Sequence, residues 1–337
     1  MLGRDERTTL IILTVSALVM TIVTICLVNN KSSKDNLILN NKIHILQTGG
    51  GNFENGFEEK YAKQKNLIGN FDTSVLEPQI NGSDLSPANW NTLVDDIASK
   101  YNSYDAFIIL HSPDTITYTA SALSFMLENL SKPVILVDTD VVPALIAISK
   151  THIPEVMIYS NGRLLRGNKT IAHSTAGYSS PNYPMLTPKT SLQMPIEAFI
   201  PRHINPKVKV RVMKLFPGFD AKHVSDTMGR DPANAIVFEL YGVGHGPTDD
   251  QFLGVISMLA KKGIVMVSVS QCSEMDAVKG NVYESNDRYI ASGILDGKDM
   301  TTEAAFTKLH YLLANVEERP LIGKIMSLSL RGEMVVL

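Results

Sequence analysis

Cysteine, tryptophan and an excess of charge of either sign are scarce in this sequence of 337 residues. Its two cysteines, Cys26 and Cys272, lie far apart, and Cys26 belongs to an apolar leader, so they form no plausible intrachain disulfide and leave the redox compartment open. Lys and Arg number 31 against 34 Asp and Glu, a formal net charge of −3. This balance provides no basic face, so we expect no nucleic-acid partner.

One long uncharged apolar run is present, Thr8 to Val28 (TTLIILTVSALVMTIVTICLV). It has roughly the 20 residues that a helix needs to cross a bilayer. A cleaved signal peptide is the alternative, but its apolar region usually has about 7–15 residues before small residues at the cut, which Leu27 to Asn30 do not provide. The run therefore predicts an uncleaved, single-pass membrane anchor. Two basic residues flank the run on each side, so the charge bias does not specify which side of the membrane carries the rest of the chain. Glycosylation at Asn81 would require that part to face a lumen or the exterior.

The stretch Phe107 to Pro133 predicts a strand, a turn and a helix. Phe107 to Leu110 is continuously apolar, His111 to Asp114 is a polar turn, and apolar residues recur at helical spacing from Thr115 onward. Chemistry in open α/β sheets collects at such strand ends. Asp114, beside a helix N-terminus, is a candidate to hold a ligand's ammonium group or to orient a proton carrier, and helix capping is its structural alternative.

These motifs resemble the bacterial type I L-asparaginases. In that family the turn is His-Gly-Thr-Asp-Thr, and Tyr118 to Leu130 (YTASALSFMLENL) reproduces the following helix residue for residue. The resemblance covers nearly everything after residue 42. It continues, in chain order, through Thr48-Gly49-Gly50, Ser83-Asp84, Leu165 to Asn168, Ser180 to Asn182, Tyr241 to Gly244, Gln271-Cys272 and Thr307 to Leu313.

The resemblance implies an α/β fold of two domains, a larger N-terminal domain with a mostly parallel sheet and a smaller C-terminal α/β domain, with the site between them at strand ends. It also implies a homodimer or homotetramer that needs neither metal nor cofactor. The segments we expect are a tail (1–7), the transmembrane anchor (8–28), a linker (29–41), the N-terminal domain (42–190), a second linker (191–206) and the C-terminal domain (207–337). In the last, we expect strands at 208–216, 235–240 and 264–270 and helices at 249–261 and 301–315.

Four residues acquire site roles from the resemblance. Thr48, at a strand tip before glycines, corresponds to the threonine that attacks the amide carbon of asparagine, although a hydrogen-bonded threonine in a glycine-rich turn is the structural alternative. Asp114 corresponds to the aspartate that holds the substrate amine. Tyr61, found by counting forward without a gap, corresponds to the tyrosine that helps activate the nucleophile. Ser83 is what remains of a substrate-binding serine pair.

Four positions of the same site depart from the family pattern. Gly51 replaces a second threonine, and Gly82 replaces the serine that binds the substrate α-carboxylate. Pro113 replaces the threonine of a Thr-Lys-Asp group, and Ala172 replaces its lysine, so a hydroxyl and an amine are both missing.

Two hypotheses for the function follow, and whether the chain is an enzyme is left open between them. The departures favour a membrane-anchored, asparaginase-like binding or scaffold protein with weak or lost amidohydrolase activity, because losing one preorganised polar group typically costs about 10²–10³ in rate. The alternative is an active hydrolase that converts L-asparagine, or a related small amide, to L-aspartate and ammonia with Thr48 as nucleophile. Outside the site, Glu239 stands where regulated members have an arginine that binds allosteric asparagine.

Overall fold

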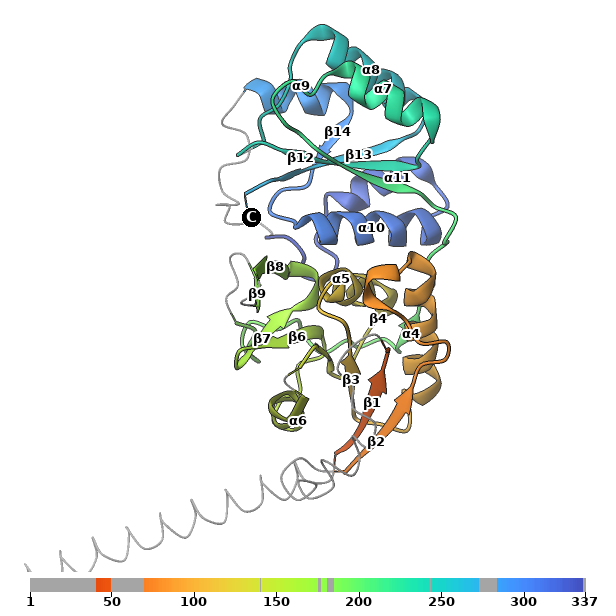
Figure 1. Ribbon diagram of the computed structural model, residues 1–337, viewed down its shortest axis with the longest axis vertical. Coiled ribbons are helices and arrows are strands. Elements are labelled where there is room, and N and C mark those ends of the chain that lie inside the picture. Colours follow the sequence, from red (N-terminus) through yellow and green to blue (C-terminus); the bar gives the residue numbers. More distant parts are fainter. Residues whose placement is uncertain are drawn as a thin grey trace, which may run out of the picture.

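The computed structural model describes residues 41–49, 70–139, 141–174, 177–180, 185–242, 244–272 and 284–335. The two larger sheets, one in each half of the chain, are stacked with helices between them and on their outer faces (Figure 1). The strands are β1 (Lys42–Gln47), β2 (Asn70–Val75), β3 (Ala106–Leu110), β4 (Leu127–Glu128), β5 (Val134–Val137), β6 (Val156–Ser160), β7 (Arg163–Arg166), β8 (Ile171–Ser174), β9 (Gly177–Ser179), β10 (Ile200–Pro201), β11 (Val210–Lys214), β12 (Ala235–Leu240), β13 (Val265–Ser270) and β14 (Ile294–Asp296). The helices are η1 (Gly82–Asp84), α4 (Pro87–Lys100), α5 (Ile116–Met126), α6 (Val141–Ser149), η2 (Gly167–Lys169), α7 (Ala221–Arg230), α8 (Asp250–Lys261), α9 (Glu284–Ser292), α10 (Thr302–Asn315) and α11 (Arg319–Met326).

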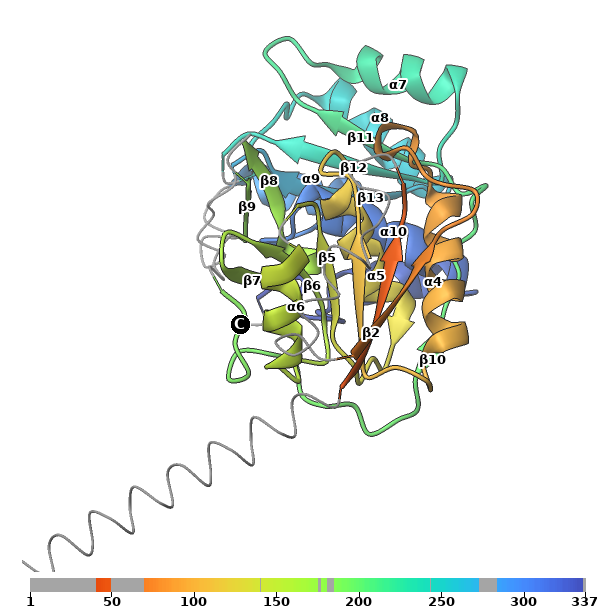
Figure 2. The same ribbon diagram turned by 60° about the horizontal axis from the view of Figure 1, so that its bottom comes forward.

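The N-terminal sheet has six strands in the order β2-β1-β3-β5-β6-β7. All pairs are parallel except β6 with β7, so the carboxyl ends of β1, β3 and β5 meet at one edge. Both faces of β3 are covered: Phe107 and Ile109 join the core with α4 and α5, while Ile108 and Leu110 join the core with α6. Burial on both sides explains why this strand is continuously apolar. Figure 2 shows α6 in front of the sheet, with α10 beyond it.

The C-terminal sheet has four parallel strands in the order β11-β12-β13-β14. Its outer face packs against α7 and α8 through a separate core that includes Phe238, Phe252 and Ile256. Its inner face packs against α10, which in turn lies against α5 of the N-terminal half. One hydrophobic core therefore runs through both halves and fixes how they sit together.

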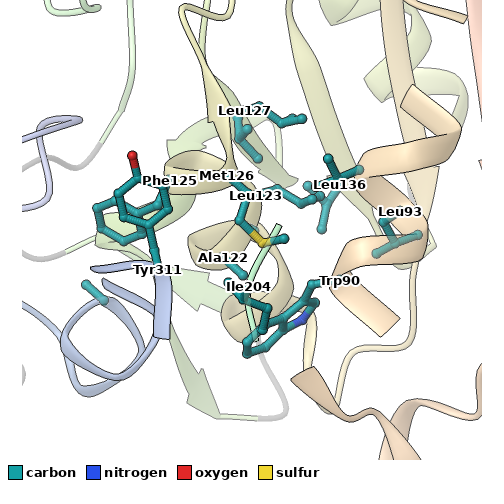
Figure 3. Packing of buried hydrophobic residues seen from close by; sticks show 14 of the residues in the cluster. Trp90, Leu93, Ala122, Leu123, Phe125, Met126, Leu127, Leu136, Ile204 and Tyr311 are labelled. Carbon is teal, nitrogen blue, oxygen red and sulfur yellow. The ribbon is translucent and has the colours of Figure 1, made fainter. Parts of the chain in front are cut away.

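Figure 3 shows this shared core where α4, α5 and α10 approach one another. Phe125 and Tyr311 lie with ring centroids 6.1 Å apart, and the Trp90 indole donates a hydrogen bond to Thr119 at 3.3 Å. The helix expected to continue to Leu130 ends at Met126, because the next residues form β4, which pairs with β10. The segment 191–206, expected to be a linker, thus contributes a short strand to the N-terminal half.

The structure corrects the prediction of a transmembrane anchor. In the described part of the chain, no helix is long and apolar enough to cross a membrane. The longest helices named above, α4 and α10, have 14 residues each, about 21 Å at 1.5 Å per residue, against a hydrocarbon core of about 30 Å. Thr8 to Val28 lies outside the described residues, so nothing in the structure supports the predicted anchor or the membrane localisation drawn from it. Only the two-domain α/β part of that fold prediction is confirmed.

Candidate active site

Thr48 immediately follows β1 and is 1% exposed. Its backbone N–H and its hydroxyl both donate to the carbonyl of Leu110, at 3.1 and 2.9 Å, so the tips of β1 and β3 are joined through this residue. Its own carbonyl accepts from the N–H of Ile80 at 2.6 Å. The side chain is therefore held at the carboxyl edge of the sheet, and its proton is directed to a backbone oxygen.

The residue after Thr48, Gly49, must be a glycine because of its backbone conformation and its close neighbour. Its φ is +97°, a conformation that L side chains rarely adopt, and a Cβ there would lie 2.6 Å from Cβ of Gln79. Glycine lets the chain turn away from the strand while the segment around Gln79 packs directly over it. The remaining glycines of this loop, Gly50 and Gly51, lie outside the described residues.

The turn after β3 has a buried half and an exposed half. His111 and Ser112 are buried, whereas Pro113 and Asp114 are exposed. The Ser112 hydroxyl donates to Asp114 Oδ2 over 3.5 Å, which is the long limit for a hydrogen bond. His111 bonds to Thr119 at 2.9 Å, and burial lowers the pKa of its imidazole, so we interpret it as a neutral structural group.

Gly82 lies against this turn from the other side. The hydroxyl of Thr115 donates to its carbonyl at 2.9 Å, which ties η1 to the N-terminus of α5. A Cβ on Gly82 would lie 2.1 Å from Cβ and 2.2 Å from Oγ of Ser112. Ser83, the next residue of η1, is exposed.

Asp138 and Tyr178 extend the site along the sheet edge. Asp138 directly follows β5 and accepts a hydrogen bond from the Tyr178 hydroxyl at 3.1 Å. Burial raises the pKa of Tyr178, and the carboxylates of Asp138 and Asp114 raise it further, so the phenol stays protonated and acts as a donor. Neither Asp138 nor Tyr178 was predicted from the sequence as a site residue.

Ala172, which replaces the family lysine, and Lys169, the nearest lysine in sequence, differ in burial. Ala172 is exposed on β8, opposite Tyr178 in the hairpin with β9. Lys169, three residues earlier, is instead buried, and its ammonium forms an ion pair with Asp299; each side chain is 1% exposed. Burial lowers the pKa of Lys169, and Asp299 opposes that effect. The nearest lysine in sequence is thus committed to a contact between the two halves.

Of the four predicted site residues, Thr48 and Asp114 follow neighbouring strands at one edge, and Ser83 lies beside Gly82 in η1. Tyr61 lies outside the described residues. Among described residues, no group of three or more His, Cys, Asp or Glu side chains could hold a metal ion.

A cavity of about 210 Å³ lies between the two halves. Glu239 and Glu303 line it together with Tyr118, Lys214 and Lys298. Glu239 accepts a hydrogen bond from the Thr302 hydroxyl at 2.7 Å. Burial raises the pKa of Glu303, and the negative charge of Glu239 contributes to the shift.

Comparison with known protein families gives two domain models, one for each half of the chain and in the same order. The N-terminal asparaginase domain model matches residues 42–197, and the glutaminase/asparaginase C-terminal domain model matches residues 209–326. L-asparaginase 1 of Escherichia coli strain K12 is 35% identical over 287 residues, which are 76% of this chain and 82% of that protein. The 60 kDa lysophospholipase of Mus musculus is 32% identical over 295 residues, 78% of this chain but 51% of the relative.

Solved structures agree with the sequence matches. The crystal structure of L-asparaginase I from Vibrio cholerae superposes with a TM-score of 0.79 at 31% identity and covers 88% of this chain and 100% of its own. The L-asparaginase from Thermococcus kodakarensis, at 23% identity and a TM-score of 0.73, shares the fold. With both domain models matched in order and these relatives aligned over most of the chain, the chain belongs to the glutaminase/asparaginase family, in which it resembles the type I asparaginases.

Proposed function

We propose that this chain binds L-asparagine or a closely related amino acid at the carboxyl ends of β1, β3 and β5, and that it hydrolyses the amide weakly or not at all. Two carboxylates support the binding half of this proposal. Asp114 is exposed on the turn after β3, and Asp138 follows the neighbouring strand β5. Asp138 accepts a hydrogen bond from the Tyr178 hydroxyl at 3.1 Å, and the charges of both carboxylates raise the pKa of that phenol, so the two carboxylates belong to one region. Such a region suits the ammonium group of an amino acid.

The observation that carries the catalytic half is the ion pair of Lys169. Ala172 provides no amine, and Lys169 is the nearby residue that would have to replace it. Its ammonium is held by Asp299 in an environment where both side chains are 1% exposed. Moving it toward the strand ends would leave the Asp299 carboxylate buried without that ammonium, which typically costs about 3–5 kcal/mol. We infer that Lys169 does not act as the relay.

Pro113 in the turn and the predicted nucleophile Thr48 also support weak or absent hydrolysis. Pro113 has neither a hydroxyl nor an N–H, so it cannot help to orient an attacking water. The Thr48 hydroxyl donates to the carbonyl of Leu110, and activation would require it to turn toward a base. Tyr61, which the family resemblance suggests as the activator, stays a prediction.

The alternative, an active asparaginase, is favoured by two observations. Thr48 is retained beside the turn that carries Asp114, and the relatives that match most of the chain include L-asparaginases. We also propose a homodimer or homotetramer, which the family resemblance supports and sedimentation velocity would test.

Ammonia release from L-asparagine and L-glutamine by the full-length chain, measured beside Thr48→Ala, separates the two functions. We expect release well below one turnover per second, with calorimetric binding of L-asparagine or L-aspartate that depends on Asp114. A rate of about one per second or more lies in the range of working enzymes. Such a rate, abolished by Thr48→Ala, would refute the proposal in favour of the hydrolase.

A further inference from the structure

The contact between Gly82 and Ser112 allows only one side chain in a shared space. Cβ of any L residue at position 82 would lie 2.1 Å from Cβ of Ser112 and 2.2 Å from its Oγ, distances that real Cβ atoms do not show. Ser112 is 4% exposed, and its neighbour Thr115 anchors the Gly82 carbonyl, so neither side moves away easily. A glycine at 82 is therefore the condition for having a serine at 112.

Two motifs of the asparaginase family that this chain resembles have the reverse arrangement. Their Asp-Ser-Ser-Asp sequence places a serine where this chain has Gly82, and their His-Gly-Thr-Asp-Thr turn places a glycine where it has Ser112. Taken alone, the glycine at position 82 means that a serine hydroxyl has been lost. Taken together, Gly82 and Ser112 exchange one hydroxyl for another, because the Ser112 side chain occupies the same space from the opposite segment.

We propose that Ser112 is the residue that recognises the ligand's α-carboxylate in this protein, in place of a side chain at position 82. Its hydroxyl donates to that carboxylate while Asp114 accepts from the ligand's ammonium group. This inference rests on the proposed function, because it assumes that an amino acid binds at the turn after β3.

The geometry of the turn supports this assignment. The hydrogen bond from Ser112 to Asp114 is 3.5 Å long and therefore weak, so the hydroxyl can be redirected to a better acceptor at little cost. The two residues are separated by one position, and the two groups they would bind are attached to the same carbon of an amino acid. An ammonium on Asp114 thus brings the α-carboxylate next to Ser112.

Titration calorimetry of the full-length chain with L-aspartate tests the inference. Ser112→Ala keeps the Cβ and removes only the hydroxyl, and we expect it to weaken binding by roughly 10- to 100-fold, the usual effect of losing a hydrogen bond to a charged group. Ser103→Ala, in an exposed turn before β3, is the matched control and should bind like the wild type.

The exchange itself is tested by moving the hydroxyl back. Gly82→Ser alone should lower the melting temperature, because its side chain meets Ser112. Ser112→Gly alone should fold but bind weakly. The double variant Gly82→Ser/Ser112→Gly should recover both the melting temperature and the affinity, to within about threefold of the wild type, because a coupled pair is not additive.

Each result has a distinct meaning. Wild-type affinity in Ser112→Ala, with binding still lost in Asp114→Ala, overturns the role of Ser112 and leaves the proposed function standing. A folded double variant that binds no better than Ser112→Gly also overturns it. If the double variant fails to fold, Ser112→Ala still decides. Folded wild-type protein that binds neither L-aspartate nor L-asparagine refutes the proposed function, and this inference with it.

Discussion

Replacing Lys169 tests whether this residue stabilises the fold and takes no part in catalysis, as the proposed function requires. Lys169→Met removes the ammonium from Asp299 while keeping most of the side-chain volume. Each of the two side chains is 1% exposed, and Asp299 also accepts a hydrogen bond from the N–H of Val335 at 2.8 Å. Breaking a buried ion pair on one side costs about 3–5 kcal/mol, because the remaining charge stays desolvated. At about 2 °C per kcal/mol for a long chain, the melting temperature should fall by roughly 6–10 °C.

The assay combines calorimetric melting with ammonia release per folded molecule. Lys169→Met/Asp299→Asn, which removes both charges, should recover at least half of the lost melting temperature, since no carboxylate is then left unpaired. Any residual hydrolysis should be the same in all of these variants. The reasoning is refuted if Lys169→Met melts within about 2 °C of the wild type, or if it abolishes a measurable hydrolysis while the protein stays folded.

Three further predictions concern other parts of the molecule. His310 is 2% exposed, and burial lowers the pKa of its imidazole from 6.5 to about 4. The unfolded chain therefore takes up a proton at this residue near pH 6.5, whereas the folded chain does so only near pH 4. The free energy of unfolding should fall by about 3 kcal/mol as the pH drops through this window. Urea unfolding of His310→Gln between pH 6.5 and 4 should show a shallower fall, and equal slopes would contradict the assignment. Asparagine should not act as an effector in the cavity between the halves, because the Glu239 carboxylate repels the ligand's own carboxylate; sigmoidal asparagine binding that disappears in Glu239→Ala would show the opposite. Pro113→Thr together with Ala172→Lys should raise ammonia release by more than the two single changes predict, and strict additivity would argue against a shared relay.

The starts of two predicted helices were predictable because the sequence carries a capping residue at each. The helix expected from Asp249 begins at Asp250, because the Asp249 side chain accepts from the N–H of Phe252 at 2.9 Å. The helix expected from Thr301 begins at Thr302 for the same reason, with Thr301 bonded to the N–H of Ala304. The end of α5 was not predictable, since apolar spacing continues to Leu130 while the chain leaves the helix to pair β4 with β10, more than 70 residues away in sequence.

The site shows a similar division. That Thr48 and the turn with Asp114 follow neighbouring strands at one edge agrees with a rule about parallel strands, whose carboxyl ends share an edge. The partner of Lys169 is separated from it by 130 residues, and nothing in the sequence near either residue indicates the pair. The exclusion between Gly82 and Ser112 arises because a Cβ at position 82 would lie about 2 Å from Cβ of Ser112. The two residues are 30 positions apart, so neither motif taken alone reveals it.

The departures from the family pattern therefore fall into two kinds with different consequences. The change at Gly82 is geometrically coupled to Ser112, and the hydroxyl removed from one segment is supplied by the other. The changes at Pro113 and Ala172 have no such counterpart among the contacts described above, since the nearby lysine is held by Asp299. If compensation preserves the groups that bind an amino acid but not those that move a proton, affinity and turnover become separable properties of this site. Variants at Ser112 should then change L-aspartate affinity without creating hydrolysis, and variants at Pro113 and Ala172 should change hydrolysis with little effect on affinity.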